Sequence, residues 1–337
     1  MVARQIETEA EWHDFRSRNI GGSEIACLFY QWVVSDGTER VFHIGEVPSD
    51  GGIVASCLSP HKTGFRLLQE RRGRLMPDDL NDNDRVIAGK HLEPAIAEWS
   101  KSKFGWNIRK VRRYIEHDSV PGWGASLDYE IHEKNAAGAP VEFKNVDFLI
   151  FRDQWQTVGD EIIMPPMHIV LQLQHQIGAA NADHGWIVVC VGGNRLYRFR
   201  MDRHEATQKR ISAAVAAFWD LVSGDGDPVW IADAGTAADL YTDTGVDRIV
   251  DLTNDEKSAF DARRITRWRK HRAAIDKRIE FMEGALMASM KNATKAKLAG
   301  FRISWPLIER PAKMVPARWQ DELVYRGRFQ ITPNKGE

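Results

Sequence analysis

The sequence predicts an α/β protein in which helices flank a mixed central sheet and a long helical arm follows. Apolar stretches at 141–146 and 185–191 are typical of buried strands. Apolar residues recur at helical spacing over 85–104 and 203–222, which predicts amphipathic helices. An approximate heptad over 253–291 predicts the arm.

Length and composition set the first bounds on function. The chain has 337 residues, of which 43% are hydrophobic, so one or two domains can each bury a core. The formal net charge of −1 excludes a uniformly basic nucleic-acid binder, and any DNA contact must come from local patches. The 3 cysteines lie far apart, which favours buried reduced thiols over a disulfide framework or a zinc or iron–sulfur site. No apolar run has membrane length and residues 1–12 lack a signal-peptide pattern, so we expect a cytoplasmic protein without membrane contact.

Residues 1–73 are predicted to contain three helices. A short amphipathic helix over 9–18 leads through glycines into a second helix over 23–29. A helix N-terminus suits a phosphate, and Arg16 and Ser23 would add donors, although a serine cap beside a solvated arginine is the simpler interpretation. Residues 31–58 predict one or two short strands in a surface excursion, and 63–73 a helix ended by glycine.

The long helix predicted over 85–104 places a carboxylate near its apolar face. Ile87, Leu92, Ile96 and Trp99 recur at helical spacing and are expected to face inward. Glu93 lies near that face and needs a partner there. The partner is either a neighbouring lysine or arginine, or a metal site to which Glu93 adds a third acidic group.

Further elements complete the predicted core, which we place at 1–222. Residues 107–115 predict a strand with a basic face, and 148–158 an aromatic lid or loop. A helix over 167–180 opens after two prolines, and the strand over 185–191 turns through glycines into another over 196–201.

A linker over 223–252 and a tail over 253–337 follow this core. Thr253 and Glu256 form a capping-box pattern at the start of the long helix, which runs to about Lys291. Strands are predicted over 297–305 and 326–331. The tail either packs on the core or on another subunit, or its basic first half follows a DNA backbone.

The stretches 124–128 (GASLD) and 141–145 (VEFKN) predict a hairpin whose connection spans 129–140. On a strand, Glu142 and Lys144 point one way and Phe143 points back into the core. The hairpin brings Asp128 beside them. Two carboxylates and an ammonium group can hold a divalent metal and steer a water, although a Glu-x-Lys pair alone is common on surface strands.

Five features in one order resemble the YqaJ-like viral recombinase family, the family of phage lambda exonuclease, within the PD-(D/E)xK nuclease superfamily. They are Arg16 with Gly22-Ser23, Gly89-x-x-x-Glu93-Pro94, Ser126-x-Asp128, Glu142-x-Lys144 and Gln172-x-x-x-Gln176. The resemblance covers roughly residues 12–202 and implies a restriction-endonuclease-like core. Tyr129 departs from the pattern, because glycine is common at that position.

The resemblance implies a metal site. Asp128 and Glu142 would coordinate Mg²⁺, or Mn²⁺ as a substitute, with the Phe143 carbonyl as a further ligand. Glu93 would complete the acidic cluster directly or through water. Lys144 would orient the attacking water or help to deprotonate it.

It also implies a phosphate pocket and an activity. Arg16, Ser23, Ser126 and Gln172 would contact a terminal 5′-phosphate. The expected enzyme is a Mg²⁺-dependent exonuclease that degrades one strand of linear duplex DNA from its 5′ end, in phage-type recombination. A homo-oligomer, in the form of a ring-like homotrimer, and a single-strand annealing protein as partner are implied too. The alternatives are an endonuclease of restriction or repair type and a catalytically silent DNA-binding assembly module.

Overall fold

The computed structural model divides the chain into two units, residues 1–244 and 245–337. The division falls within the segment 223–252 that the sequence predicts as a linker. The structure describes residues 2–5, 8–34, 37–46, 52–111, 113–132, 138–241 and 250–310, and four strands beyond them at 313–315, 318–320, 323–326 and 330–333. Each unit is considered by itself.

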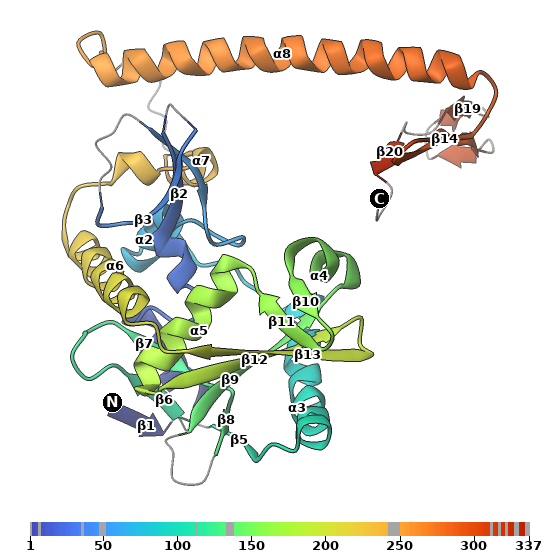
Figure 1. The fold of residues 1–337 in the computed structure, drawn as a ribbon. Helices are drawn as coiled ribbons and strands as arrows, with labels where there is room; N and C mark the ends of the chain where they lie inside the picture. Colours follow the sequence, from blue (N-terminus) through green and yellow to red (C-terminus); the bar gives the residue numbers. More distant parts are fainter. Residues whose placement is uncertain are drawn as a thin grey trace. The chain divides into compact units, whose positions relative to one another are not determined.

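The first unit is built on a mixed seven-stranded sheet, which confirms the predicted fold class (Figure 1). Its strand order is β10-β11-β13-β12-β9-β8-β5. The interior strand β9 pairs in parallel with β12 and antiparallel with β8. The strands are β5 (Ile108–Lys110), β8 (Tyr129–Ile131), β9 (Ala139–Val146), β10 (Gln156–Val158), β11 (Glu161–Met164), β12 (His184–Val191) and β13 (Arg195–Asp202).

Two helices cover opposite faces of this sheet because its strands are apolar on both sides. On β12, Val188 and Cys190 join the cluster that contains Ile96 of α3 (Asp84–Phe104). The alternate residues Ile187 and Val189 join the cluster that contains Leu173 of α5 (Met167–Ala180). Phe143 of β9 belongs to the α3 cluster, so its neighbours Glu142 and Lys144 point toward the α5 side.

The rest of the first unit surrounds a third core cluster that includes Phe29, Tyr30, Trp123 and Phe218. Two three-stranded sheets contribute to it, in the orders β1-β6-β7 and β3-β2-β4. Their strands are β1 (Val2–Gln5), β2 (Phe29–Val33), β3 (Glu39–His43), β4 (Ile53–Cys57), β6 (Arg113–Glu116) and β7 (Gly124–Ser126). The helices are α1 (Glu9–Ser17), η1 (Ile25–Leu28), α2 (Gly64–Arg71), α4 (Phe148–Gln154), α6 (Glu205–Ser223), η2 (Val229–Ile231) and α7 (Ala234–Leu240).

Several predicted elements are wrong because strand pairing between distant segments decides their structure. The helix expected over 23–29 is only the four-residue 3₁₀ turn η1, because Phe29 already begins β2, which pairs with β3 and β4. That pairing also places Trp32 in the core, where it is only 7% exposed, so β2 is not part of a surface excursion. Residues 107–115 form two strands, because β5 joins β8 whereas β6 joins β1 and β7.

Three further corrections concern elements in and around the predicted site. The hairpin partner of β9 is β8, whereas Gly124–Ser126 (β7) pairs with β6 in another sheet. On α3 only Ile96 of the four expected apolar residues is buried. Ile87, Leu92 and Trp99 are each 37% exposed, because α3 packs through a narrow strip around Ile96 and Ala97. Residues 148–158 are the helix α4 and the strand β10.

The second unit consists of α8 (Glu256–Met290) and a set of short strands. Asp255 caps the helix by accepting from Ser258 N–H, so the capping box expected at Thr253 is wrong. The strand expected over 297–305 is a hairpin that turns at Gly300, whose φ is +73°. Of the strand expected over 326–331, residues 327–329 lie outside the described part. The strands are β14 (Lys295–Leu298), β15 (Phe301–Ser304), β16 (Leu307–Arg310), β17 (Lys313–Val315), β18 (Arg318–Gln320), β19 (Leu323–Arg326) and β20 (Gln330–Pro333).

Among the described residues, every helix is too short or too polar to cross a membrane.

Candidate active site

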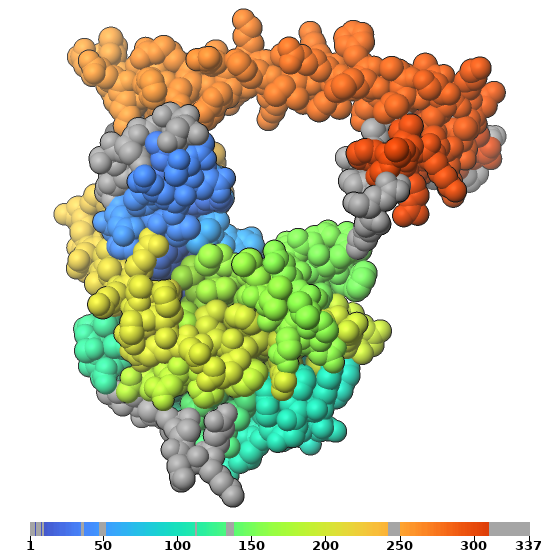
Figure 2. All heavy atoms as spheres, viewed as in Figure 1, coloured from blue at the N-terminus to red at the C-terminus, as the bar shows by residue number. Residues whose placement is uncertain are grey.

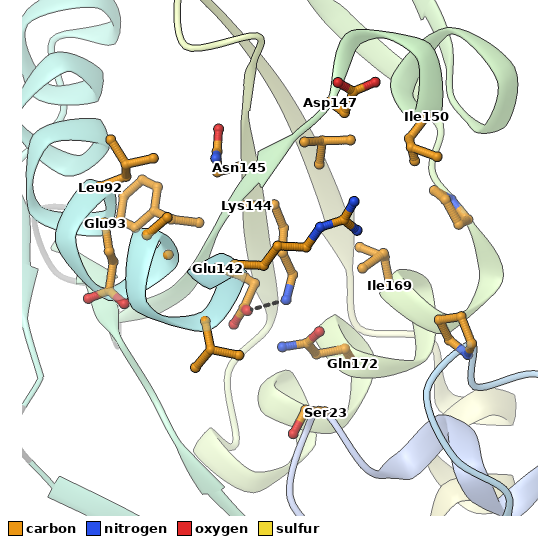
Figure 3. Close-up of a pocket in the computed structure, with 18 of the residues that line it drawn as sticks. Ser23, Leu92, Glu93, Glu142, Lys144, Asn145, Asp147, Ile150, Ile169 and Gln172 are labelled. Atoms are coloured by element: carbon orange, nitrogen blue, oxygen red, sulfur yellow. Dashed lines mark ion pairs between the residues drawn. The ribbon is translucent and has the colours of Figure 1, made fainter. Parts of the chain in front are cut away.

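The strand β9 holds Glu142 and Lys144 side by side, as two-residue strand spacing requires (Figure 3). Lys144 Nζ lies 2.7 Å from Glu142 Oε1. The second oxygen of Glu142 accepts a hydrogen bond of 2.6 Å from Gln176 Nε2 of α5. Glu142 is only 6% exposed, so both contacts are needed to compensate its burial.

Asp128 lies next to Glu142 by strand register. Tyr129 pairs with Val141 at the end of the β8–β9 ladder, so Asp128 and Glu142 are the next residues along it. Burial, followed by the charges of Glu142 and Glu93, raises the pKa of Asp128 well above its usual value, and Lys144 acts against this. Asp128 therefore lies in a patch where negative charge accumulates.

Glu93 of α3 is the third carboxylate of this patch. Its side chain lies 3.8 Å from Lys110 Nζ on β5, which supplies the lysine partner that the simpler interpretation required. Burial raises the pKa of Glu93, Lys110 lowers it and Glu142 raises it again. Glu93 thus belongs to the same electrostatic cluster as Asp128 and Glu142, and is not fully neutralised by its lysine.

These side chains line one pocket of about 940 Å³. The sequence-predicted residues on its wall are Ser23, Glu93, Asp128, Glu142, Phe143, Lys144 and Gln172. Figure 3 shows Ser23 in the loop before η1, Glu93 on α3, Glu142 and Lys144 on β9, and Gln172 on α5. Asp128 lies between β7 and β8. Segments far apart in the sequence therefore meet at this pocket.

The glycine loop brings Ser23 to the pocket. A Cβ built at Gly22 would lie 3.3 Å from Gln172 Cγ and 3.4 Å from Gln176 Cγ, so only glycine packs without displacing these glutamines. The loop therefore lies directly against α5. Ser23 is exposed beside Gln172 at the pocket wall.

Arg16 and Ser126 are not among the residues that line this pocket. The Arg16 guanidinium lies 4.6 Å from the Trp12 ring centroid and 3.8 Å from Glu24 Oε1. Glu24 also accepts 2.9 Å hydrogen bonds from Arg71 at both oxygens. Ser126 is exposed on β7. The structure thus brings together two of the four predicted phosphate contacts, Ser23 and Gln172.

The pocket also contains basic groups that sequence reasoning missed, among them Arg85, Lys90, His61 and His168. Burial, with smaller effects from His61 and Lys144, lowers the pKa of His168 to about 4. His168 is therefore neutral at pH 7 and can donate or accept a hydrogen bond. No periodicity marks these residues, because the loops and helix ends that carry them meet only in the folded chain.

The donor set fits a divalent cation. Magnesium prefers carboxylate oxygens together with waters and phosphate oxygens. A cation beside Asp128 and Glu142 would relieve the repulsion that raises the pKa of Asp128. Within the described ranges, no three His, Cys, Asp or Glu side chains form a ready-made metal cluster. Glu142, whose two oxygens contact Lys144 and Gln176, would have to exchange one of these partners.

Residues 49–183 match the model of the YqaJ-like viral recombinase domain. The match confirms the predicted resemblance and the predicted class of enzyme, a nuclease that hydrolyses DNA. Glu93, Asp128, Glu142, Lys144 and Gln172 lie inside the YqaJ-like segment, whereas the loop that carries Ser23 precedes it.

Solved structures with a similar chain trace include an alkaline exonuclease (LHK-Exo) from Laribacter hongkongensis. It is 16% identical, with a TM-score of 0.44, and the match covers 63% of this chain and 92% of that chain. LHK-Exo in complex with dAMP is also 16% identical, with a TM-score of 0.44 and coverage of 64% and 92%. No curated protein sequence matches this chain.

Proposed function

We propose that this chain is a Mg²⁺-dependent exonuclease that degrades one strand of linear duplex DNA from its 5′ end, in phage-type recombination. The observation that carries the proposal is the pocket in which Asp128, Glu142 and Lys144 converge within a YqaJ-like domain. Duplex ends are the proposed substrate. A ring-like homotrimer and a single-strand annealing partner remain part of the proposal from the family resemblance.

The acidic residues are proposed to hold the ion. Asp128, Glu142 and the Phe143 carbonyl would be ligands of Mg²⁺ or Mn²⁺, with Glu93 joining directly or through water. Bound there, the metal supplies activation of the nucleophilic water and stabilisation of charge on the leaving oxygen.

Lys144 is proposed to position the water. Its ammonium group is held by Glu142 at 2.7 Å and faces the pocket beside Asp128. An ammonium group can donate hydrogen bonds to the attacking water and to a non-bridging phosphate oxygen at once. Lys144 thereby sets the direction of attack on the scissile phosphate.

The end phosphate is proposed to bind at Ser23 and Gln172. Both residues line the pocket and supply a hydroxyl and an amide donor. Arg16 would join by exchanging the 3.8 Å contact with Glu24 for the phosphate. Ser126 would join as the DNA end reaches β7. Arg85 and His168 add donors for the remaining backbone phosphates.

The test compares linear duplexes with 5′-phosphate or 5′-hydroxyl ends and a covalently closed circle, each with Mg²⁺ or with EDTA. We expect Mg²⁺-dependent release of mononucleotides from the linear substrates, fastest from phosphorylated ends, and no cutting of the circle. The variant Glu142→Gln should lose activity, whereas Glu98→Gln, at an exposed position on the same α3 helix as Glu93, should not. Release of nucleotides by Glu142→Gln at the wild-type rate would refute the assignment. Cutting of the circle would favour an endonuclease.

A further inference from the structure

The first half of α8 carries a strong concentration of positive charge. Residues 263–278 contain eight lysine and arginine side chains and one aspartate, whereas the whole chain has a net charge of −1. Every residue of this segment except Arg264 is exposed. In Figure 2 side chains project from α8 along its length. The segment is therefore a basic surface on a long helix.

Five of these cations lie on one side of the helix. At 3.6 residues per turn they fall within about 100° of its circumference and extend over about 22 Å of its axis. The remaining residue of that sector between Arg263 and Arg278 is Ala274, whose small side chain leaves the cations accessible. The five, which form the basic stripe, are Arg263, Arg267, Lys270, Lys277 and Arg278.

The basic stripe has no counter-charge in the part of the chain that the structure describes. None of its side chains takes part in an ion pair or a cation–π contact there. Asp276 and Glu280 lie on another side of the helix. Arg263 and Arg267 are four residues apart, and Arg267 and Lys270 three apart, and like charges at this spacing destabilise a helix. A polyanion bound along the stripe would relieve that repulsion.

The apolar residues of the same segment of α8 lie on the side opposite the basic stripe. They are Ile265, Trp268, Ile275, Ile279 and Met282. A helix that lies on a membrane buries its apolar side, so its opposite side faces bulk water. The basic stripe would then point away from anionic lipid, and Arg272 would lie among the buried apolar residues. The arrangement therefore favours a polyanion on the stripe over a membrane surface.

The composition of the basic stripe favours a duplex over a single strand of nucleic acid. Proteins that bind single strands combine cations with aromatic side chains on which unpaired bases stack. The sequence places Phe260 before the stripe and Phe281 beyond it, and no aromatic residue within its sector between Arg263 and Arg278. Cations alone suit the phosphates of a duplex, because these face outward along its backbone.

We propose that the basic stripe of α8 binds the phosphate backbone of duplex DNA. The choice of DNA as the polyanion rests on the proposed nuclease function. Arginine donates two parallel hydrogen bonds to a phosphate, whereas lysine acts as a point charge. The stripe holds the duplex without reading its sequence, because phosphate contacts carry no direct information about the bases.

Binding of the full-length chain to a duplex closed by a hairpin at both ends tests this surface. The probe has no free end for the pocket, and EDTA in the buffer prevents metal-dependent cleavage. Fluorescence anisotropy over a salt series measures the affinity. With five phosphate contacts, the logarithm of the binding constant should fall against the logarithm of salt concentration with a slope of about −4.5. Arg263→Gln/Arg267→Gln should reduce that slope by about 2 and weaken binding at least about tenfold at about 0.1 M salt.

Arg269→Gln/Arg272→Gln is the matched control, because it removes the same charge from the same helix outside the basic stripe. Its affinity should stay within about threefold of wild type, since salt screens charges that do not contact the phosphates. Glutamine and arginine have similar helix propensities, so circular dichroism should show equal helix content in both variants. Equal weakening by the two variants, or a wild type that does not bind the closed duplex, would overturn the proposal.

Two further probes distinguish duplex DNA from other polyanions. A single strand of the same length should bind more weakly than the closed duplex. Vesicles of phosphatidylserine and phosphatidylcholine should bind the stripe variant and the control variant equally. Tighter binding to the single strand, or vesicle binding that only the stripe variant loses, would contradict a stripe that binds duplex DNA.

These assays contain no catalytic step. Stripe-dependent binding by a protein that releases no nucleotides would remove the proposed function and leave this surface. Nuclease activity without stripe-dependent binding would remove this surface and leave the proposed function.

Discussion

Glu24 and Glu142 are both buried carboxylates beside a cation, yet their surroundings differ in charge balance. Glu24 is 8% exposed, and its oxygens accept hydrogen bonds from Arg71, with Arg16 nearby and the Gly21 N–H at 3.2 Å. Glu142 is 6% exposed and contacts Lys144 and Gln176. The charges of Asp128 and Glu93 act on the same patch.

The difference separates a structural ion pair from a site that can bind further charge. Cations outnumber the carboxylate around Glu24, so its charge is neutralised where it lies. Around Glu142 the carboxylates are in excess, and the patch opens into the pocket. Perturbed carboxylates that line a cleft indicate a functional site, whereas a balanced buried pair indicates structure. The predictions below test this contrast, beginning with the largest expected effect.

Asp128→Asn should reduce nuclease activity at least about 10³-fold, because several kcal/mol of metal-dependent transition-state stabilisation would be lost. The same change should raise the melting temperature, since it removes a buried carboxylate whose pKa its neighbours raise. Nucleotide release and calorimetric unfolding measure the two effects. A fall in both activity and melting temperature would instead indicate a structural role for Asp128.

Glu24→Gln should show the opposite pattern. It leaves the buried Arg71 guanidinium without its carboxylate, which should cost about 3 kcal/mol in the free energy of unfolding. Activity per folded molecule should change less than threefold. Urea unfolding measures the stability, and rate measurements below the unfolding transition measure the activity. A large loss of activity with wild-type stability would contradict a structural role for Glu24.

The buried histidine of α5 should make folding stability depend on pH. Burial lowers the pKa of His175 to about 3, against about 6.5 in an unfolded chain. Between these values the unfolded state binds the extra proton, so stability falls as the pH drops below about 6.5. At pH 5 the loss should be about 2 kcal/mol. His175→Gln should flatten this part of the unfolding free-energy curve, and an equal slope in the variant would contradict the assignment.

The smallest effect is expected at Arg16. Arg16→Ala should lower the preference for 5′-phosphate over 5′-hydroxyl ends about tenfold, the lower end of the effect of losing one charge-assisted hydrogen bond. Lys101→Ala, at an exposed position on α3, is the control. An unchanged preference would mean that Arg16 contributes only to the structural charge cluster around Glu24 and not to phosphate binding.

The sequence alone predicts those parts of the molecule whose structure depends on local sequence patterns. The helices over 85–104, 167–180 and 203–222 are predicted from patterns within each segment, and the bounds of α3, α5 and α6 match them closely. The Glu142–Lys144 pairing follows from strand geometry alone. These features needed no knowledge of distant segments.

Features decided by distant contacts were not predictable in the same way. Both Gly124–Ser126 and Tyr129–Ile131 are three-residue strands, and only the folded sheets show which one pairs with β9. The apolar residues Ile87, Leu92 and Trp99 of α3 are exposed because the helix packs on the sheet only around Ile96 and Ala97. Arg16 contacts Glu24, whose side chain makes no capping hydrogen bond to η1. The sequence pattern alone does not show that these two side chains meet.

The central claim is that Asp128 and Glu142 share a divalent cation, and calorimetric titration of wild type and Asp128→Asn with Mn²⁺ tests it most directly. We expect wild type to bind with release of protons when the titration is run near the raised pKa of Asp128, because burial and the neighbouring carboxylates raise that pKa and a cation favours the ionised carboxylate. The variant should bind more than about 100-fold more weakly, beyond the usual effect of an outer-shell change. Equal affinity in the two proteins, with no proton release, would contradict the account.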